Sequence, residues 1–325
     1  MVPFITTFAV GVSVSSITQC PSLTPRATPA KDITDLRPDD IKVMGGLGDS
    51  IMAGYVMMGV DGPIDIDSLL EYRGHSYAIG ADENAVTVAN FMNHYQPIKK
   101  GPSVGTHLAT TCNRMNTFAG IDVKNDWKMI TIQIGSNDQC SYCNTTHKDK
   151  VTPDSYGANI EAAIQTIQSK IPKTLVNLVG TFNVSQVFPL SQTKGLNYCL
   201  MDNNDTSTIK NNRMCSCSAP SNHETMDELS AQYNQKLKAI AEKYKPQPNG
   251  TFGVVYHPAN VDIMSFPIEA LSNYDCFHPS VVGHSYMAKI AWNMLFLPSD
   301  QQPSVYTFDP NQQIYCPTDD DRIQI

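Results

Sequence analysis

The chain has 325 residues and a mass of 35.8 kDa, which allows one large α/β domain or two smaller ones. Its hydrophobic content of 41%, charged content of 17% and mean hydropathy of -0.24 exclude a disordered acidic tail, and no apolar run reaches the roughly 18 residues of a membrane span. A net charge of -8 without a dense Lys/Arg cluster disfavours nucleic-acid binding. We therefore expect a soluble globular protein.

The N-terminus carries an apolar stretch, Phe4 to Val12, followed by Val14-Ser15-Ser16, which suits a signal-peptidase site. Residues 1–18 are therefore predicted to be a signal peptide, although the usual positive n-region is missing and a frayed N-terminus is the alternative. Residues 19–38 are rich in Pro, Thr and Ser, which is typical of a linker or an N-terminal wrap. We expect residues 39–325 to form a single domain with a C-terminal wrap.

Short apolar runs that end in turn residues predict four buried strands, at residues 41–47, 127–134, 174–181 and 252–256. Apolar positions at helical spacing predict helices at residues 155–171, 223–244 and 285–297. The first of these helices would gather Ile160, Ala163, Ile164 and Ile167 on one face. Strands that alternate with helices predict an α/β fold with a parallel sheet covered on both faces. Sites in such sheets lie beyond the carboxyl ends of the strands.

Cysteines and sequons indicate an oxidising compartment. Nine cysteines are many for a cytosolic enzyme of this size, and the odd number leaves one thiol free, paired between chains or without its partner. Seven are disulfide candidates, with their pairing left open: Cys140, Cys143, Cys199, Cys215, Cys217, Cys276 and Cys316. Four Asn-x-Ser/Thr sequons are glycosylation candidates: Asn144, Asn183, Asn204 and Asn249.

The Cys140-Ser141-Tyr142-Cys143 segment has the spacing of a redox motif. It does not begin a helix after a thioredoxin-like strand, so we interpret it as a structural disulfide pair. A zinc site is disfavoured because no second ligand pair occurs at suitable spacing.

Three side chains at predicted strand ends and loops point to nucleophilic chemistry. Gly48-Asp49-Ser50 puts a hydroxyl on the turn after the first strand, and Asp275-Cys276-Phe277-His278 puts a carboxylate three residues before an imidazole. A serine becomes a nucleophile when an imidazole takes its proton, and a carboxylate fixes the tautomer of that imidazole. We therefore predict a triad of Ser50, His278 and Asp275. The Ser50 backbone N–H and the Asn137 side-chain amide are predicted to hold the oxyanion.

Several of these residues have a plainer interpretation. A serine after Gly-Asp is also ordinary turn chemistry, in which Asp49 accepts a backbone hydrogen bond. Asn137 is alternatively a turn residue, and Arg73 is either a contact for a phosphate head group or a salt-bridge partner. We interpret His284 as a structural residue, and His75 as a residue that lines the rim of the site.

Three motifs in this order, Gly48-Asp49-Ser50, Gly135-x-Asn137-Asp138 and Asp275-x-x-His278, resemble the GDSL or SGNH hydrolases. Other segments resemble the animal phospholipase B branch of that family: Arg37 to Val43, Tyr72 to Gly80, Asp126 to Lys128, Ile134 to Cys140, Gly283-His284 and Trp292 to Leu295. The resemblance covers residues 20–316 and implies a three-layer α/β/α sandwich with a central, mostly parallel sheet. It also implies hydrolysis of carboxylic esters without a metal or cofactor, on phospholipids or lysophospholipids.

Two segments depart from the family pattern. Gly135-Ser136-Asn137-Asp138 stands where the family has Gly-Gly-Asn-Asp, which should leave the amide in place. Asn116 to Gly120 resembles the segment whose glycine supplies a second oxyanion donor, so Gly120 is the candidate. Only six residues separate Gly120 from the strand at Trp127, whereas a parallel crossover needs about a dozen or more. We therefore expect a local rearrangement or a lost helix there, with weakened folding or activity.

Together these features predict a secreted or extracellular serine esterase of the SGNH type that hydrolyses lipid esters through an acyl-enzyme. The expected partners are a lipid or ester substrate and, peripherally, a membrane or micelle surface, and the expected state is a monomer. Two alternatives stay open. One is a catalytically impaired homologue that binds lipid, and the other is a short-chain or carbohydrate esterase on the same scaffold.

Overall fold

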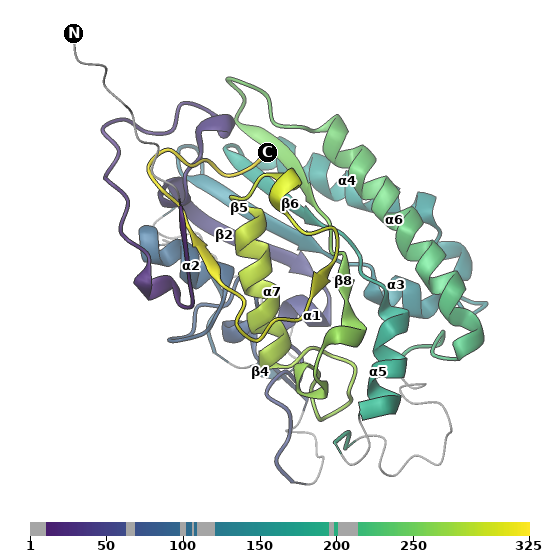
Figure 1. Ribbon diagram of the computed structural model, residues 1–325. Coiled ribbons are helices and arrows are strands. Elements are labelled where there is room, and N and C mark those ends of the chain that lie inside the picture. Colours follow the sequence, from purple (N-terminus) through teal and green to yellow (C-terminus); the bar gives the residue numbers. More distant parts are fainter. Residues whose placement is uncertain are drawn as a thin grey trace.

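The computed structural model describes residues 11–62, 69–97, 102–105, 107–108, 121–194, 198–200 and 214–325 (Figure 1). At the centre of this part of the chain lies a sheet of four parallel strands in the order β2-β5-β6-β7. The strands are Ile41–Gly48 (β2), Trp127–Gln133 (β5), Thr174–Val179 (β6) and Phe252–His257 (β7). All four strands predicted from apolar runs are confirmed, each to within two residues at its ends.

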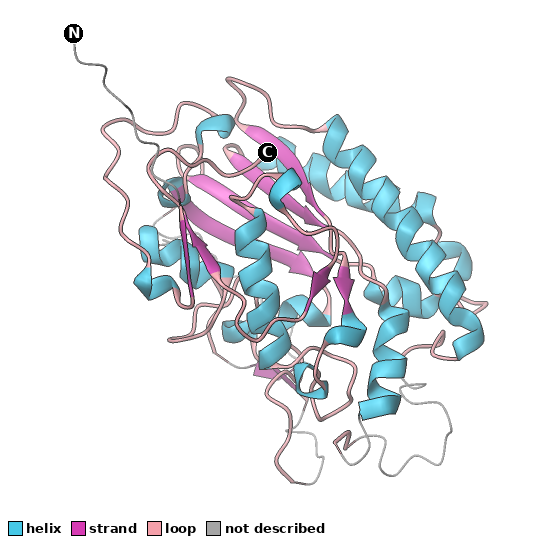
Figure 2. Cartoon of the chain, viewed as in Figure 1, coloured by secondary structure: helices cyan, strands magenta, loops and turns pink. Residues whose placement is uncertain are grey.

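Helices cover both faces of the sheet, as Figure 2 shows. One face packs against α2 and α7, and the other packs against α4 and α6. These helices are Val88–Tyr95 (α2), Pro153–Lys170 (α4), His223–Lys243 (α6) and Val281–Met294 (α7). The arrangement confirms the three-layer α/β/α sandwich that the family resemblance implies.

Helix α4 begins where the sequence supplies a cap. Thr152 accepts a hydrogen bond from Ser155 N at the start of α4, whose first residue is Pro153. Along α4, Ile160, Ile164 and Ile167 are buried, as the helical spacing predicts. Shorter elements complete the described chain: α1 (Ser50–Ala53), α3 (Ser136–Ser141), α5 (Val187–Lys194), β3 (Leu70–Glu71) with β4 (His107–Leu108), and β8 (Val261–Asp262) with β9 (Tyr306–Thr307).

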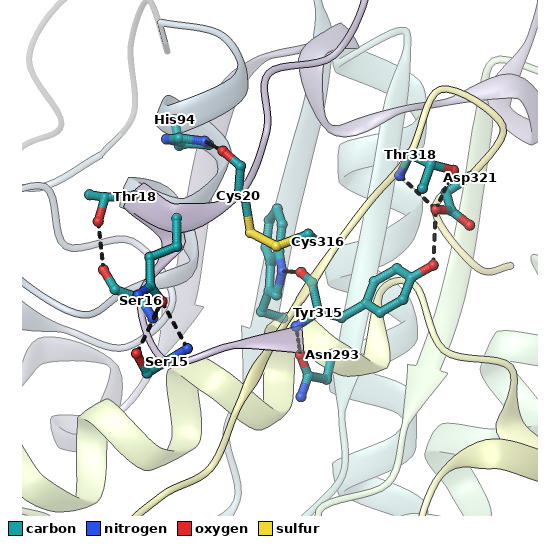
Figure 3. Close-up of a disulfide and its surroundings, with 12 residues drawn as sticks. Ser15, Ser16, Thr18, Cys20, His94, Asn293, Tyr315, Cys316, Thr318 and Asp321 are labelled. Atoms are coloured by element: carbon teal, nitrogen blue, oxygen red, sulfur yellow. Dashed lines mark hydrogen bonds between the residues drawn. A yellow bond between two sulfur atoms is a disulfide. The ribbon is translucent and has the colours of Figure 1, made fainter. Parts of the chain in front are cut away.

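The N-terminal segment packs against the C-terminal one. β1 (Val12–Val14) pairs antiparallel with β10 (Ile314–Cys316), and a disulfide joins Cys20 to Cys316 (Figure 3). Further along, Ile33 and Leu36 are completely buried in the core. The segment from Cys20 onward therefore wraps the domain. β1 lies within residues 1–18, for which the signal peptide stays a prediction.

Three more disulfides join Cys140 to Cys215, Cys143 to Cys217 and Cys199 to Cys276. All seven candidate cysteines are therefore paired, but the interpretation of Cys140 and Cys143 as a pair with one another is wrong. About one helical turn separates these two residues, so both side chains face the same neighbouring segment and each bonds to it separately. Cys20 was not among the candidates, and the ninth cysteine, Cys112, lies outside the described residues.

The sequons differ in their surroundings. Asn249 is exposed, whereas Asn144 and Asn183 are half-buried, and Asn204 lies outside the described residues. Glycosylation at each of them stays a prediction. In the part of the chain that the structure describes, every helix is too short or too polar to cross a membrane.

Candidate active site

The turn after β2 holds Ser50 at the carboxyl end of the sheet. Asp49 is the N-cap of α1, and its Oδ1 accepts a hydrogen bond from Ile51 N at 3.0 Å. A side chain at Gly48 would lie 2.4 Å from the carbonyl oxygen of Gln133, so only glycine lets the two strands approach here. Ser50 is the first residue of the helix that follows. The predicted role of Asp49 in holding this turn is therefore confirmed.

The second part of the site is the loop before α7. Ser50 Oγ lies 2.8 Å from His278 Nε2, and His278 Nδ1 lies 2.6 Å from Asp275 Oδ2. Asp275 is completely buried, and its Oδ1 accepts hydrogen bonds from the backbone N–H groups of Phe277 and His278. The carboxylate is thus fixed by its own loop and oriented at the imidazole. Serine, histidine and aspartate form one continuous hydrogen-bonded chain.

Hydrogen bonds join the part of the site that carries Ser50 to the part that carries His278. The chain after α1 meets the loop before α7, where Ser272 Oγ donates to the Val56 carbonyl at 2.6 Å and Val281 N donates to the Met57 carbonyl at 3.0 Å. The side chain of Asn273 bonds both the backbone N–H and the carbonyl of Val60. These bonds join the serine side of the site directly to the histidine side.

Two further residues lie beside His278: Tyr55, which the sequence analysis did not single out, and Cys276, which it named only as a disulfide candidate. The ring of Tyr55 meets the His278 ring edge-on, with 4.9 Å between centroids. Burial raises the pKa of Tyr55 to about 12, so its hydroxyl stays protonated at neutral pH. Cys276 has a left-handed backbone, with φ at +50°, and is bonded to Cys199. The position of Cys276 inside the Asp-x-x-His motif is the one sequence signal that points to this brace; nothing in the sequence singles out Tyr55.

Of the predicted oxyanion donors, Asn137 lies within the described residues and Gly120 lies outside them. Asn137 is the second residue of α3, directly beyond the carboxyl end of β5, and β5 is the neighbour of β2 in the sheet. Its side chain is exposed at the same edge where Ser50 lies. Gly135, with φ at +129°, makes the turn between β5 and α3. Gly120 lies outside the described residues, and so does the segment that departs from the family pattern.

Burial affects the acidic groups beside the serine. It raises the pKa of Asp49 above its ordinary value, and it does the same for Asp138, which follows Asn137. Asp49 Oδ2 is buried and has no hydrogen-bond partner among the described residues. Its other oxygen caps α1, so the carboxyl group holds the turn that carries Ser50.

Other residues singled out from the sequence are not members of the hydrogen-bonded chain. Arg73 forms an ion pair with Glu71, which is the plainer of its two interpretations. His75 Nε2 lies 3.6 Å from Asp82 Oδ2, and its place at the rim of the site stays a prediction. His284 is buried and accepts a hydrogen bond from the backbone N–H of Tyr77 at 3.3 Å, as expected of a structural residue.

Within the described ranges, no three His, Cys, Asp or Glu side chains gather closely enough to hold a metal ion. The chemistry that this arrangement offers by itself is activation of a serine hydroxyl by a carboxylate-oriented imidazole, at the carboxyl end of a parallel sheet. That is the arrangement of a serine hydrolase.

A family model described as GDSL-like lipase/acylhydrolase matches residues 45–291, and the chain belongs to this family. The chain is 29% identical over 339 residues to "Phospholipase B1, membrane-associated" of Homo sapiens and 27% identical over 335 residues to that of Rattus norvegicus. Each alignment covers 92% of this chain but 22% of the relative, so the chain spans about a fifth of the length of these curated relatives.

A solved structure of a catalytic mutant of an acetylxylan esterase from Geobacillus stearothermophilus is 20% identical to the chain. The alignment covers 52% of this chain and 58% of the esterase chain, and the TM-score is 0.28.

Proposed function

We propose that this protein is a secreted serine esterase that hydrolyses carboxylic esters of lipids, in the manner of a phospholipase B or lysophospholipase. The observation that carries the proposal is the continuous hydrogen-bonded chain from Ser50 Oγ through His278 to the buried Asp275 carboxylate. An isolated turn serine needs no such partners. Family membership supports an ester or lipid substrate, and the phospholipase B relatives support a lipid one.

In the proposed acylation step, Ser50 Oγ attacks the ester carbonyl carbon while His278 Nε2 takes the hydroxyl proton. Asp275 stabilises the imidazolium and keeps Nδ1 as the proton-bearing nitrogen, as the 2.6 Å contact favours. The carbonyl oxygen becomes an oxyanion, for which the Ser50 backbone N–H, the Asn137 amide and the Gly120 backbone N–H are the proposed donors. The intermediate collapses when the bond to the alcohol oxygen breaks and His278 returns the proton to that oxygen.

Deacylation repeats the sequence with water. His278 takes a proton from water, the resulting hydroxide attacks the acyl carbon, and the bond to Ser50 Oγ breaks as His278 returns the proton to the serine. The products are a carboxylic acid and the free enzyme. Each oxyanion donor is worth about 3 kcal/mol of barrier in hydrolases of this kind.

A secreted location is the second part of the proposal. Four disulfides tie together segments that lie far apart in the chain, and disulfides of this kind persist in oxidising compartments. We also propose that contact with a membrane or micelle surface is peripheral and that the enzyme acts as a monomer.

The test is hydrolysis of a lysophospholipid and of a short-chain nitrophenyl ester by the purified protein beside a Ser50→Ala variant. We expect turnover of the lysophospholipid that disappears in the variant. Equal turnover by both proteins would contradict a role for Ser50 as nucleophile.

The same assay separates the alternatives. Turnover of the short ester alone would favour a short-chain or carbohydrate esterase. A folded, monodisperse protein without any turnover would favour a lipid-binding homologue that has lost activity, with the segment before Trp127 as the first place to look.

A further inference from the structure

A cavity of about 120 Å³ lies between the sheet and α7. Its walls are almost wholly apolar. Along α7 it is lined by Gly283, Met287 and Ala291, which repeat every four residues and therefore form one stripe on the helix. Cavities of this kind stay dry and accept apolar guests.

Polar side chains from the sheet also line the cavity, and some of their atoms are bonded to a neighbouring side chain. Gln133 lines it, but its Oε1 accepts a hydrogen bond from the Tyr77 hydroxyl at 2.8 Å. Asn177 and His257 also line it, and their polar atoms Oδ1 and Nε2 lie 3.4 Å from each other. Burial lowers the pKa of His257 to about 4, so the imidazole is neutral at ordinary pH. The cavity therefore suits an uncharged, apolar guest.

One end of the cavity reaches the immediate neighbours of the proposed reacting groups. Ile51, which lines it, follows Ser50 in α1. Phe277 and Pro279 also line it, and they flank His278 in the chain. Because Ser50 Oγ and His278 Nε2 are 2.8 Å apart, these three lining residues come from both sides of the point where an ester carbonyl would sit.

We propose that this cavity is the acyl-chain pocket of the enzyme and that it sets the preferred acyl length. The inference rests on the proposed function, since it names what part of the ester the same site takes. An acyl group on Ser50 has an apolar tail to bury, and the cavity, which includes the chain neighbours of Ser50 and His278 in its lining, offers walls that are almost wholly apolar.

The size of the cavity gives the expected length. An engineered protein cavity of about 150 Å³ holds benzene, so a volume of about 120 Å³ encloses roughly six carbons. Longer tails must extend beyond it. Burial of a methylene is worth about fourfold in binding, so preference should rise with each carbon up to this length and then level off.

The test uses nitrophenyl esters with acetyl, butanoyl, hexanoyl and decanoyl chains. We expect kcat/KM to rise about fourfold per methylene up to hexanoyl and to change little from hexanoyl to decanoyl. Ala291→Leu fills the cavity and should lower the hexanoyl-to-acetyl ratio of kcat/KM at least about tenfold. Met287→Ala enlarges it and should extend the rise to longer chains. Ala162→Leu, the same change on the exposed face of α4, is the matched control and should keep the wild-type ratio.

Binding in a Ser50→Ala background keeps this inference separable from the proposed function. Calorimetry should give a dissociation constant for nitrophenyl hexanoate far below that for nitrophenyl acetate, and Ala291→Leu added to this background should remove the difference. Tighter binding of the hexanoyl ester, combined with no turnover by the wild type, would overturn the esterase proposal and support the pocket. Turnover with a ratio that neither Ala291→Leu nor Met287→Ala changes would overturn the pocket and leave the esterase proposal standing.

Discussion

The two faces of the central sheet bury different kinds of side chain. Toward α4 and α6 the sheet packs apolar side chains into one cluster: Ile132, Val176, Leu178 and Val254. Toward α7, near the carboxyl ends of the strands, it presents buried polar side chains: Thr131, Gln133, Asn177 and His257. The first face is packed as a core, whereas the second borders the cavity beneath the proposed reacting groups.

Stability and function therefore depend on opposite faces of the central sheet. Apolar burial on the α4 and α6 face contributes to the free energy of folding at every pH. The α7 face gives up part of that gain, because His257 must be kept neutral and a volume is left unfilled. Substitutions on the two faces should therefore change different quantities.

The largest expected effect is on the active-site side. Ser50→Ala should reduce kcat/KM by at least about 10⁴-fold, because the nucleophile and its base act as one unit. Its free energy of unfolding should stay within about 0.5 kcal/mol of the wild type, since among the described residues the serine side chain bonds only to His278. Ester kinetics and urea unfolding of the same preparations check both statements. A large loss of stability with modest loss of rate would reverse the assignment.

The next effect concerns the orientation of the imidazole. Asp275→Asn should lower kcat by about 10⁴-fold. The amide NH2 would donate a hydrogen bond to His278 Nδ1, where the carboxylate oxygen accepts one, and so favour the tautomer that carries its proton on Nε2. The variant should still bind substrate. Steady-state kinetics with a nitrophenyl ester measures the change, and a kcat within tenfold of the wild type would contradict the role proposed for Asp275.

On the opposite face, Ile164→Ala should cost about 2 to 5 kcal/mol of unfolding free energy, because Ile164 is completely buried against the sheet. The kcat of the folded fraction should be that of the wild type. Urea unfolding followed by circular dichroism gives the stability, and rates are compared well below the midpoint. A drop in kcat in the folded variant would mean that the two faces are not independent.

The smallest effect is a change in pH dependence. The folded pKa of His257 is about 4, below the 6.5 of an exposed imidazole, so the unfolded chain binds the proton first. The stability that the neutral His257 contributes is therefore fully present above pH 6.5 and is lost as the pH falls toward 4. His284, whose pKa burial lowers to about 3, acts in the same direction.

Replacing one of these histidines should flatten the pH profile. Between pH 7 and pH 5, the free energy of unfolding of His257→Gln should fall by about 2 kcal/mol less than that of the wild type. Unfolding midpoints measured in urea at the two pH values test this difference. Parallel profiles for variant and wild type would show that His257 is not the group that titrates.

Much of the fold and site follows from local patterns. Apolar runs that end in glycine, such as the one before Gly48, predict strands because both faces of a parallel sheet are covered. The three ordered motifs bring Ser50, His278 and Asp275 to one place, which their spacing in the chain alone does not reveal. Here the family resemblance carried the prediction, and the hydrogen-bonded chain agrees with it.

Other features depend on tertiary structure and went unpredicted. α5 contains Pro189 within its first turn, where proline is tolerated, and such a proline hides a helix from a pattern search. Cys20 lies in a segment rich in Pro and Thr, and its partner is 296 residues away. Ile33 and Leu36 lie in the same segment and are buried only because the segment wraps the domain. Long-range contacts of this kind leave no periodic signal in the sequence.

The most direct test of the central claim is labelling with a fluorophosphonate, followed by peptide mapping. Ser50 Oγ would attack phosphorus, form the serine ester and release fluoride, while His278 takes the proton. Our account predicts one adduct per chain, on the peptide that contains Ser50, and none in Ser50→Ala or after unfolding in urea. An adduct on another serine, or none in folded protein, would contradict it.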